Sequence, residues 1–173
     1  MLNSIQENYL KNLSYDKSKK VVHIYPWNPG LRKTAHELML EIQKLLPGAR
    51  LFFLGSAALE IPGMNDIDIS IVSAGTFDDD RKKLSDLYGG STDSHGRRYS
   101  LWEFERGGFP VELSLNNDIA RQLQEQIDTC EILKQNPDSL KEYEQIKLGS
   151  EGLPFREYMR RKYEFFNRVL GLG

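Results

Sequence analysis

Three short motifs in this sequence carry residue types suited to metal and phosphate chemistry. Gly55-Ser56 follows an apolar run, Asp66-Ile67-Asp68 begins after nine further residues, and Glu112 lies in a later alternating run. Carboxylate oxygens are ligands that favour Mg²⁺ or Mn²⁺ over zinc. A glycine permits close approach of the backbone to a phosphate, and a serine at a helix start adds a hydroxyl beside free N–H groups. Together the motifs predict a site for two divalent cations and a phosphorylated ligand.

The segment from Asp66 to Val72 alternates acidic or hydroxyl side chains with isoleucine. In a strand, this period of two places Asp66 and Asp68 on one face and the isoleucines on the other. At a rise of roughly 3.3 Å per residue, the two aspartate Cα atoms lie about 7 Å apart. Their side chains can then converge on metals roughly 3.5 to 4 Å apart. Each motif alone is explained by a common turn or a solvated acidic residue, but their order along the chain favours a site.

The elements that must position these residues are predicted by periodicity and by the Gly and Pro positions. We expect a polar N-terminal arm over 1–20 with one short helix, a short apolar stretch over 21–25, and a helix over 31–46. Further predictions are strands over 50–54, 66–72, 99–105 and 109–115, short helices over 57–60 and 78–88, a loop over 91–96, and helices throughout 118–170, with new ones at Pro137 and Pro154. The fold class is therefore α/β (α+β): a small mixed sheet bearing the carboxylates, helices on one face, and a helical C-terminal part.

Length and composition limit the class of protein. The 173 residues predict a single domain, and 39% hydrophobic with 28% charged residues is typical of a globular chain. A formal net charge of -2 gives no overall positive field, so we do not expect nucleic acid as a partner. No apolar run reaches the roughly 20 residues of a membrane span. The single cysteine, Cys130, and the absence of a signal-like start predict a cytoplasmic protein without a disulfide.

Other reactive residue types have simpler explanations. Asp78-Asp79-Asp80 begins a predicted helix, where acidic side chains favour the helix dipole. The three histidines lack zinc spacing, and Cys130 lies on an apolar helix stripe typical of a core thiol. Arg97 and Arg98 flank a strand, where arginines are usually solvated. None of these residues is predicted to belong to the site.

The order Gly55-Ser56, Asp66-Ile67-Asp68 and a later strand carboxylate resembles the signature of the DNA polymerase beta-like nucleotidyltransferase superfamily. The run 53–58, Phe-Leu-Gly-Ser-Ala-Ala, followed by Pro62-Gly63, resembles more closely the GrpB family within it. Trp27 and the pairs Tyr143 with Lys147 and Tyr158 with Lys162 also resemble that family, and the likeness spans about 25–170.

Two departures from the GrpB pattern matter. Glu60-Ile61 intervenes before Pro62-Gly63, so the loop that follows Ser56 differs from the family's. Many GrpB-like sequences hold an apolar residue where Asp66 stands and a histidine near Glu112. This chain instead has the three-carboxylate set of active nucleotidyltransferases, which favours catalysis.

The resemblance implies a metal-dependent transfer of a nucleoside monophosphate from a nucleoside triphosphate to an unidentified small molecule or protein. It implies that Asp66, Asp68 and Glu112 hold Mg²⁺ or Mn²⁺ and that Gly55 and Ser56 contact the triphosphate. Lys147 or Lys162 would offset phosphate charge, although either is also explained as a solvated helix residue. The alternative is a non-catalytic module that binds a nucleotide or a partner protein on the same fold.

Overall fold

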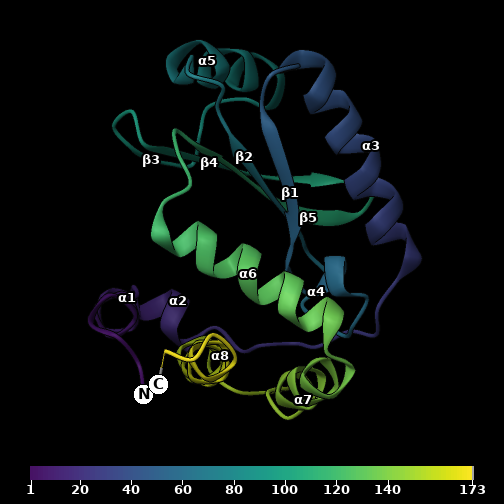
Figure 1. Ribbon diagram of the computed structural model, residues 1–173, viewed down its shortest axis with the longest axis vertical. Coiled ribbons are helices and arrows are strands. Elements are labelled where there is room, and N and C mark those ends of the chain that lie inside the picture. Colours follow the sequence, from purple (N-terminus) through teal and green to yellow (C-terminus); the bar gives the residue numbers. More distant parts are fainter. Residues whose placement is uncertain (173) are drawn as a thin grey trace.

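A computed structural model describes residues 1–172 and has a mixed α/β architecture (Figure 1). Its centre is a five-stranded sheet of order β1-β2-β5-β4-β3, in which β2 and β5 are parallel and the other neighbours antiparallel. The strands are β1 (Arg50–Leu54), β2 (Ile67–Val72), β3 (Asp93–His95), β4 (Tyr99–Arg106) and β5 (Phe109–Asn116). The predicted small mixed sheet is confirmed, and the predicted strands 99–105 and 109–115 form an antiparallel hairpin, β4–β5.

Two helices cover one face of the sheet: α3 (Pro29–Leu45) and α5 (Phe77–Tyr88). Asn28 caps α3 by accepting the Gly30 N–H, and Pro29 occupies its first turn, where a missing N–H costs nothing. The fully buried residues Ile67, Ile69 and Ile71 of β2 face this layer. The alternation seen in the sequence therefore directs β2's polar side chains to the opposite face.

The C-terminal part is helical, as predicted, and consists of α6 (Arg121–Gln135), α7 (Pro137–Leu148) and α8 (Phe155–Val169). Helix α6 packs beside β1 and the short helix α4 (Gly55–Leu59), forming a second apolar core around Leu133 and Phe165. Helices α7 and α8 lie beyond α6, away from α5 (Figure 1). Pro137 begins α7, and Pro154 directly precedes α8.

Two predicted segments, 1–20 and 91–96, differ from the structure. The N-terminal arm forms two helices, α1 (Ser4–Asn12) and α2 (Tyr15–Lys19), which pack on α8 because Leu10 supplies a buried apolar contact within a polar segment. The stretch 21–25 makes only isolated bridges, Val21 to Pro154 and Tyr25 to Gly63. The segment 91–96 is not wholly a loop, because β3 pairs with β4 within it. No helix in residues 1–172 has both the length and the apolar character to cross a bilayer.

Candidate active site

The carboxylates predicted to act together lie on two adjacent parallel strands. Asp68 of β2 is the register partner of Glu112 of β5, and Asp66 stands one residue before β2 begins. Neighbouring strands are about 4.8 Å apart, so Asp68 and Glu112 are side by side on the face opposite the isoleucines. Asp66 and Asp68 are half-buried, whereas Glu112 is exposed. The fold thus brings the three predicted acidic positions to one region of the sheet.

Gly55 lies directly against Asp68. It follows β1, whose last residue Leu54 is the register partner of Asp68, and it has a left-handed φ of 76°. A Cβ atom placed on Gly55 would overlap the Asp68 Oδ2 atom. The glycine is therefore needed both for the turn into α4 and for the close approach of the Asp68 carboxylate.

We expect Gly55→Ala to destabilise the protein by about 1–3 kcal/mol, since an L side chain is strained at positive φ and the Asp68 carboxylate must also move. Chemical denaturation of the variant measures this loss. Gly75→Ala is a matched control, because Gly75 also has positive φ (102°) but its added Cβ would meet no atom within 4 Å. An equal cost for the two variants would show that the contact with Asp68 contributes nothing.

Ser56 meets the loop that follows α4. A Cβ atom on Gly63 would overlap the Ser56 Oγ atom and would lie 3.7 Å from the Lys147 Nζ atom. Tyr25 fixes this loop by exchanging two backbone hydrogen bonds with Gly63, of 2.7 and 3.0 Å. Gly63 therefore lies against both the Ser56 side chain and the Lys147 ammonium group.

Lys147 is buried, with 3% of its surface exposed, so its explanation as a solvated helix residue is wrong. Its Nζ atom donates a 2.9 Å hydrogen bond to the Tyr158 hydroxyl and lies 5.2 Å from the centre of the Tyr143 ring. The pKa of Lys147 is lowered to about 8, because the effect of burial outweighs the opposing effect of the negative charges of Asp66 and Asp68. A buried ammonium group therefore faces the carboxylates from α7.

In the sequence, each of the two lysines follows a tyrosine by four residues. In the structure, however, Lys147 donates its hydrogen bond to a tyrosine of another helix. Tyr158 belongs to α8, and no local periodicity connects it to α7. The apolar periodicity of α8 predicts that the face of the helix carrying Tyr158 is buried. It does not predict which element packs against that face. Tyr158 is thus a site residue that the sequence motif includes, but its role as the hydrogen-bond partner of Lys147 is visible only in the structure.

Opposing charges surround Asp68. The pKa of Asp68 is raised to about 8, first by burial and then by the charges of Asp66 and Glu112, against the lowering effect of Lys162 and Lys147. Although Glu112 is exposed as a whole residue, partial desolvation of its carboxyl group raises its pKa, and the charges of Asp66 and Glu103 raise it further. Lys162 of α8 is half-buried and acts on both Asp68 and Glu112. Carboxylates on the sheet and lysines on α7 and α8 therefore form one electrostatic site.

The donor chemistry of this site suits a hard divalent cation, because its acidic groups are oxygen ligands whose mutual repulsion a cation would relieve. Within residues 1–172, no group of three or more His, Cys, Asp or Glu side chains is placed closely enough to hold a metal ion as it stands. The joint metal site of Asp66, Asp68 and Glu112 therefore stays a prediction.

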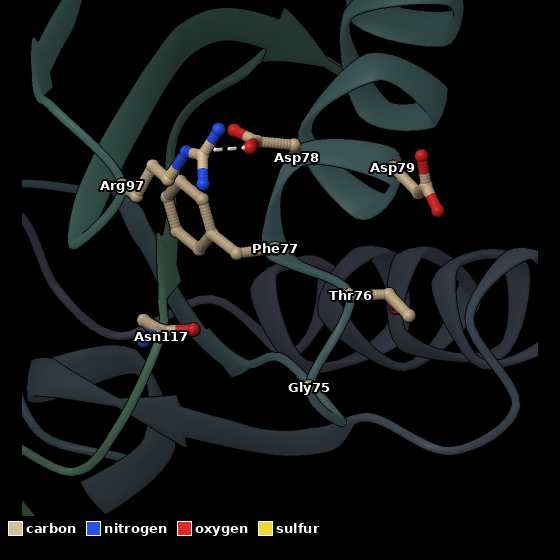
Figure 2. A pocket seen from close by; sticks show the side chains of 7 residues that line it. All are labelled: Gly75, Thr76, Phe77, Asp78, Asp79, Arg97 and Asn117. Carbon is tan, nitrogen blue, oxygen red and sulfur yellow. Dashed lines mark ion pairs between the residues drawn. The ribbon is translucent and has the colours of Figure 1, made fainter.

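A separate pocket of about 370 Å³ lies at the other end of β2, where α5 begins (Figure 2). Arg97 and Asp78 line it and form a 2.8 Å ion pair, and none of the predicted site residues contributes to it. Asp80 is buried and accepts hydrogen bonds from Ser73 (2.8 Å) and Thr76 (3.2 Å). The acidic run 78–80 thus holds the start of α5, and Arg97 is paired with it.

No protein-family model matches the chain, and no curated protein matches its sequence. Among solved structures, it resembles the Cid1 poly(U) polymerase with MgGTP bound, at 14% identity and a TM-score of 0.47, over 78% of this chain and 45% of that one. It also resembles a cytoplasmic RNA terminal U-transferase, at 16% identity and a TM-score of 0.41, over 73% of this chain and 43% of that one. The chain spans less than half of either structure, and so weak a likeness assigns neither reaction nor substrate.

Proposed function

We propose that this chain is a metal-dependent nucleotidyltransferase of the DNA polymerase beta-like superfamily. It would transfer a nucleoside monophosphate from a nucleoside triphosphate to an acceptor whose identity is open. The observation that carries this proposal is the position of Asp68, which lies against Gly55 and next to Glu112, with the charges of Lys147 and Lys162 acting on it from the helical side. Acidic and basic groups facing one another in this way suit a cation and a triphosphate together.

In the proposed reaction, Asp66, Asp68 and Glu112 would hold Mg²⁺ or Mn²⁺, which offsets phosphate charge and lowers the pKa of an acceptor hydroxyl. Ser56 would donate its hydroxyl hydrogen to a phosphate oxygen. The buried Lys147 ammonium and the half-buried Lys162 would offset the charge that builds up on the phosphates. The acceptor oxygen bonds to the α-phosphorus as the bond to the bridging oxygen breaks, and pyrophosphate leaves.

The GrpB-like assignment rests on Gly55-Ser56, Pro62-Gly63 and the strand that follows, and it belongs to this proposal. The low net charge favours an acceptor other than nucleic acid, but the solved structures named above refer to poly(U) and RNA and lend this preference no support. A small molecule, a protein and an RNA end are therefore all acceptors to test.

Pyrophosphate release tests the proposal. The protein would be incubated with each of the four ribonucleoside triphosphates and Mg²⁺ or Mn²⁺, with glycerol, a protein mixture and a short RNA offered in turn as acceptors. We expect metal-dependent release of pyrophosphate with at least one combination. Saturable binding of a triphosphate without release under any condition would favour the non-catalytic binding module, and absence of both would contradict the proposal.

Ser56→Ala separates a phosphate contact from a structural role. We expect the affinity for ATP with Mn²⁺ to fall by roughly 1.5–3 kcal/mol, the loss typical of a hydrogen bond to a charged group. Stability should change little, because the residue at the cap position of α4 is Leu54 and no side chain caps that helix. Isothermal titration and a melting curve of the same variant measure the two effects, and lost stability with unchanged affinity would remove Ser56 from the site.

A further inference from the structure

The N-terminal arm, defined as residues 1–20, packs on the helix that carries two of the proposed site residues. Helix α8 contributes Tyr158, the hydrogen-bond partner of Lys147, and Lys162. Leu10 of α1 is 2% exposed and belongs to an apolar cluster with Val22, Tyr158 and Met159. One face of α8 therefore meets α7, and another meets the arm.

A buried pair of amides joins the arm to α8. Gln6 donates a 2.9 Å hydrogen bond to the Asn167 Oδ1 atom, and Asn167 donates a 2.8 Å bond to the Gln6 Oε1 atom. Asn167 also donates to the Met1 carbonyl at 2.7 Å, and it is 1% exposed. Buried amides that satisfy one another fix a single register, because any sliding of the helices leaves unpaired polar groups.

We propose that the Gln6–Asn167 pair and Leu10 are positioning residues that hold α8 so that Tyr158 keeps the Lys147 ammonium directed at the site. The part of this inference that concerns nucleotide binding rests on the proposed function. The amide pair itself contacts none of the predicted metal-binding or phosphate-binding side chains, and it acts on Lys147 through Tyr158. Separately, Lys17 of the arm is close enough to Glu112 for its charge to lower the pKa of that carboxyl group. Loss of the arm contact therefore lowers triphosphate affinity while the sheet and its α3 and α5 layer stay folded.

Chemical labelling of lysine tests the positioning role without any nucleotide. In the intact 173-residue chain, Lys147 would be acylated slowly relative to Lys141, an exposed residue of the same helix. We expect Gln6→Ala to raise the labelling of Lys147 relative to Lys141 by about threefold or more, since it loosens α8 locally. An unchanged ratio in a variant shown to be folded would overturn the inference, whether or not the chain binds nucleotides.

The matched control is Asn3→Ala. Asn3 and Gln6 form the capping box of α1, in which Asn3 accepts the Gln6 N–H at 2.9 Å and Gln6 accepts the Asn3 N–H at 3.0 Å. Asn3→Ala weakens the same helix but keeps the amide pair with Asn167, so labelling of Lys147 should not change. Leu10→Val, a milder change of the arm contact, serves if Gln6→Ala does not fold, and it should raise the labelling in the same direction.

A double-mutant cycle then tests the route through Tyr158. We expect Gln6→Ala to weaken ATP binding roughly fivefold, a size typical of residues that act on a site without touching its ligand. In a Tyr158→Phe background, Gln6→Ala should add little, because the hydroxyl through which it acts is gone. If the two substitutions weaken ATP binding independently, so that their fold-changes multiply in the double variant, Gln6 does not act through Tyr158. If Gln6→Ala raises the labelling of Lys147 but the wild type binds no triphosphate, the positioning role stands and only the proposed function is rejected.

Discussion

Replacing Asp68 with asparagine is expected to lower metal-dependent pyrophosphate release by about 100-fold or more, the size typical of losing one charged group that stabilises a phosphoryl-transfer transition state. Asparagine keeps the shape of the side chain against Gly55 but loses the charge that a hard cation requires. The measurement is the initial rate of release with saturating Mn²⁺. Asp79→Asn, an exposed acid in the first turn of α5, is the matched control and should leave the rate unchanged. A rate within twofold of wild type would remove Asp68 from the reaction.

Asp68→Asn should also change how the melting temperature depends on pH in the absence of metal. The pKa of Asp68 in the folded protein is raised to about 8, against about 3.9 in an unfolded chain. A raised pKa stabilises the fold below pH 4 and loses that contribution as pH rises towards and through 8. The metal-free wild type should therefore melt at progressively lower temperature across this range, and Asp68→Asn should show a flatter profile. If the melting temperature of the variant falls more steeply with pH than that of the wild type, Asp68 is not the cause of the decline.

The second large effect is expected for Lys147→Met. Loss of the ammonium should weaken ATP binding about 10- to 100-fold, since hydrogen bonds to charged groups contribute 1.5–3 kcal/mol and each 1.4 kcal/mol is tenfold. Stability should fall by only about 1–3 kcal/mol, because the buried Tyr158 hydroxyl loses its hydrogen-bond partner while methionine keeps most of the apolar stem among the rings of Tyr143 and Tyr158. Titration of ATP and a melting curve measure both quantities.

Lys141→Met is the control for that variant, since Lys141 lies on the same helix but is exposed. It should bind ATP as the wild type does. If Lys147→Met binds ATP normally but melts at a lower temperature, Lys147 is a structural residue of the α7–α8 contact and not part of a phosphate site.

The sequence alone determined the parts of this protein that depend on local periodicity and on special residues. The alternation of Ile67, Ile69 and Ile71 with Asp68 fixes which face of β2 is buried, and the break at Gly55 ends β1 beside it. Pro137 and Pro154 marked the starts of helices. Pro137 lies in the first turn of α7, where a fixed φ and a missing N–H are tolerated, and Pro154 is the cap residue directly before α8. These signals act over a few residues, so they are readable without the fold.

Only the tertiary structure decided which distant residues meet. Lys147 bonds to Tyr158 on the next helix, and Gln6 bonds to Asn167 across 161 positions of the chain. Leu10 looked like one apolar residue in a polar arm, and its burial depends on the surface that α8 presents. Such contacts arise because each helix must bury its apolar stripe against some partner, and the stripe does not specify which partner that is. The sequence therefore names both the acidic residues and Lys147 as candidates, whereas the burial of Lys147 and its bond to Tyr158 follow only from the tertiary structure.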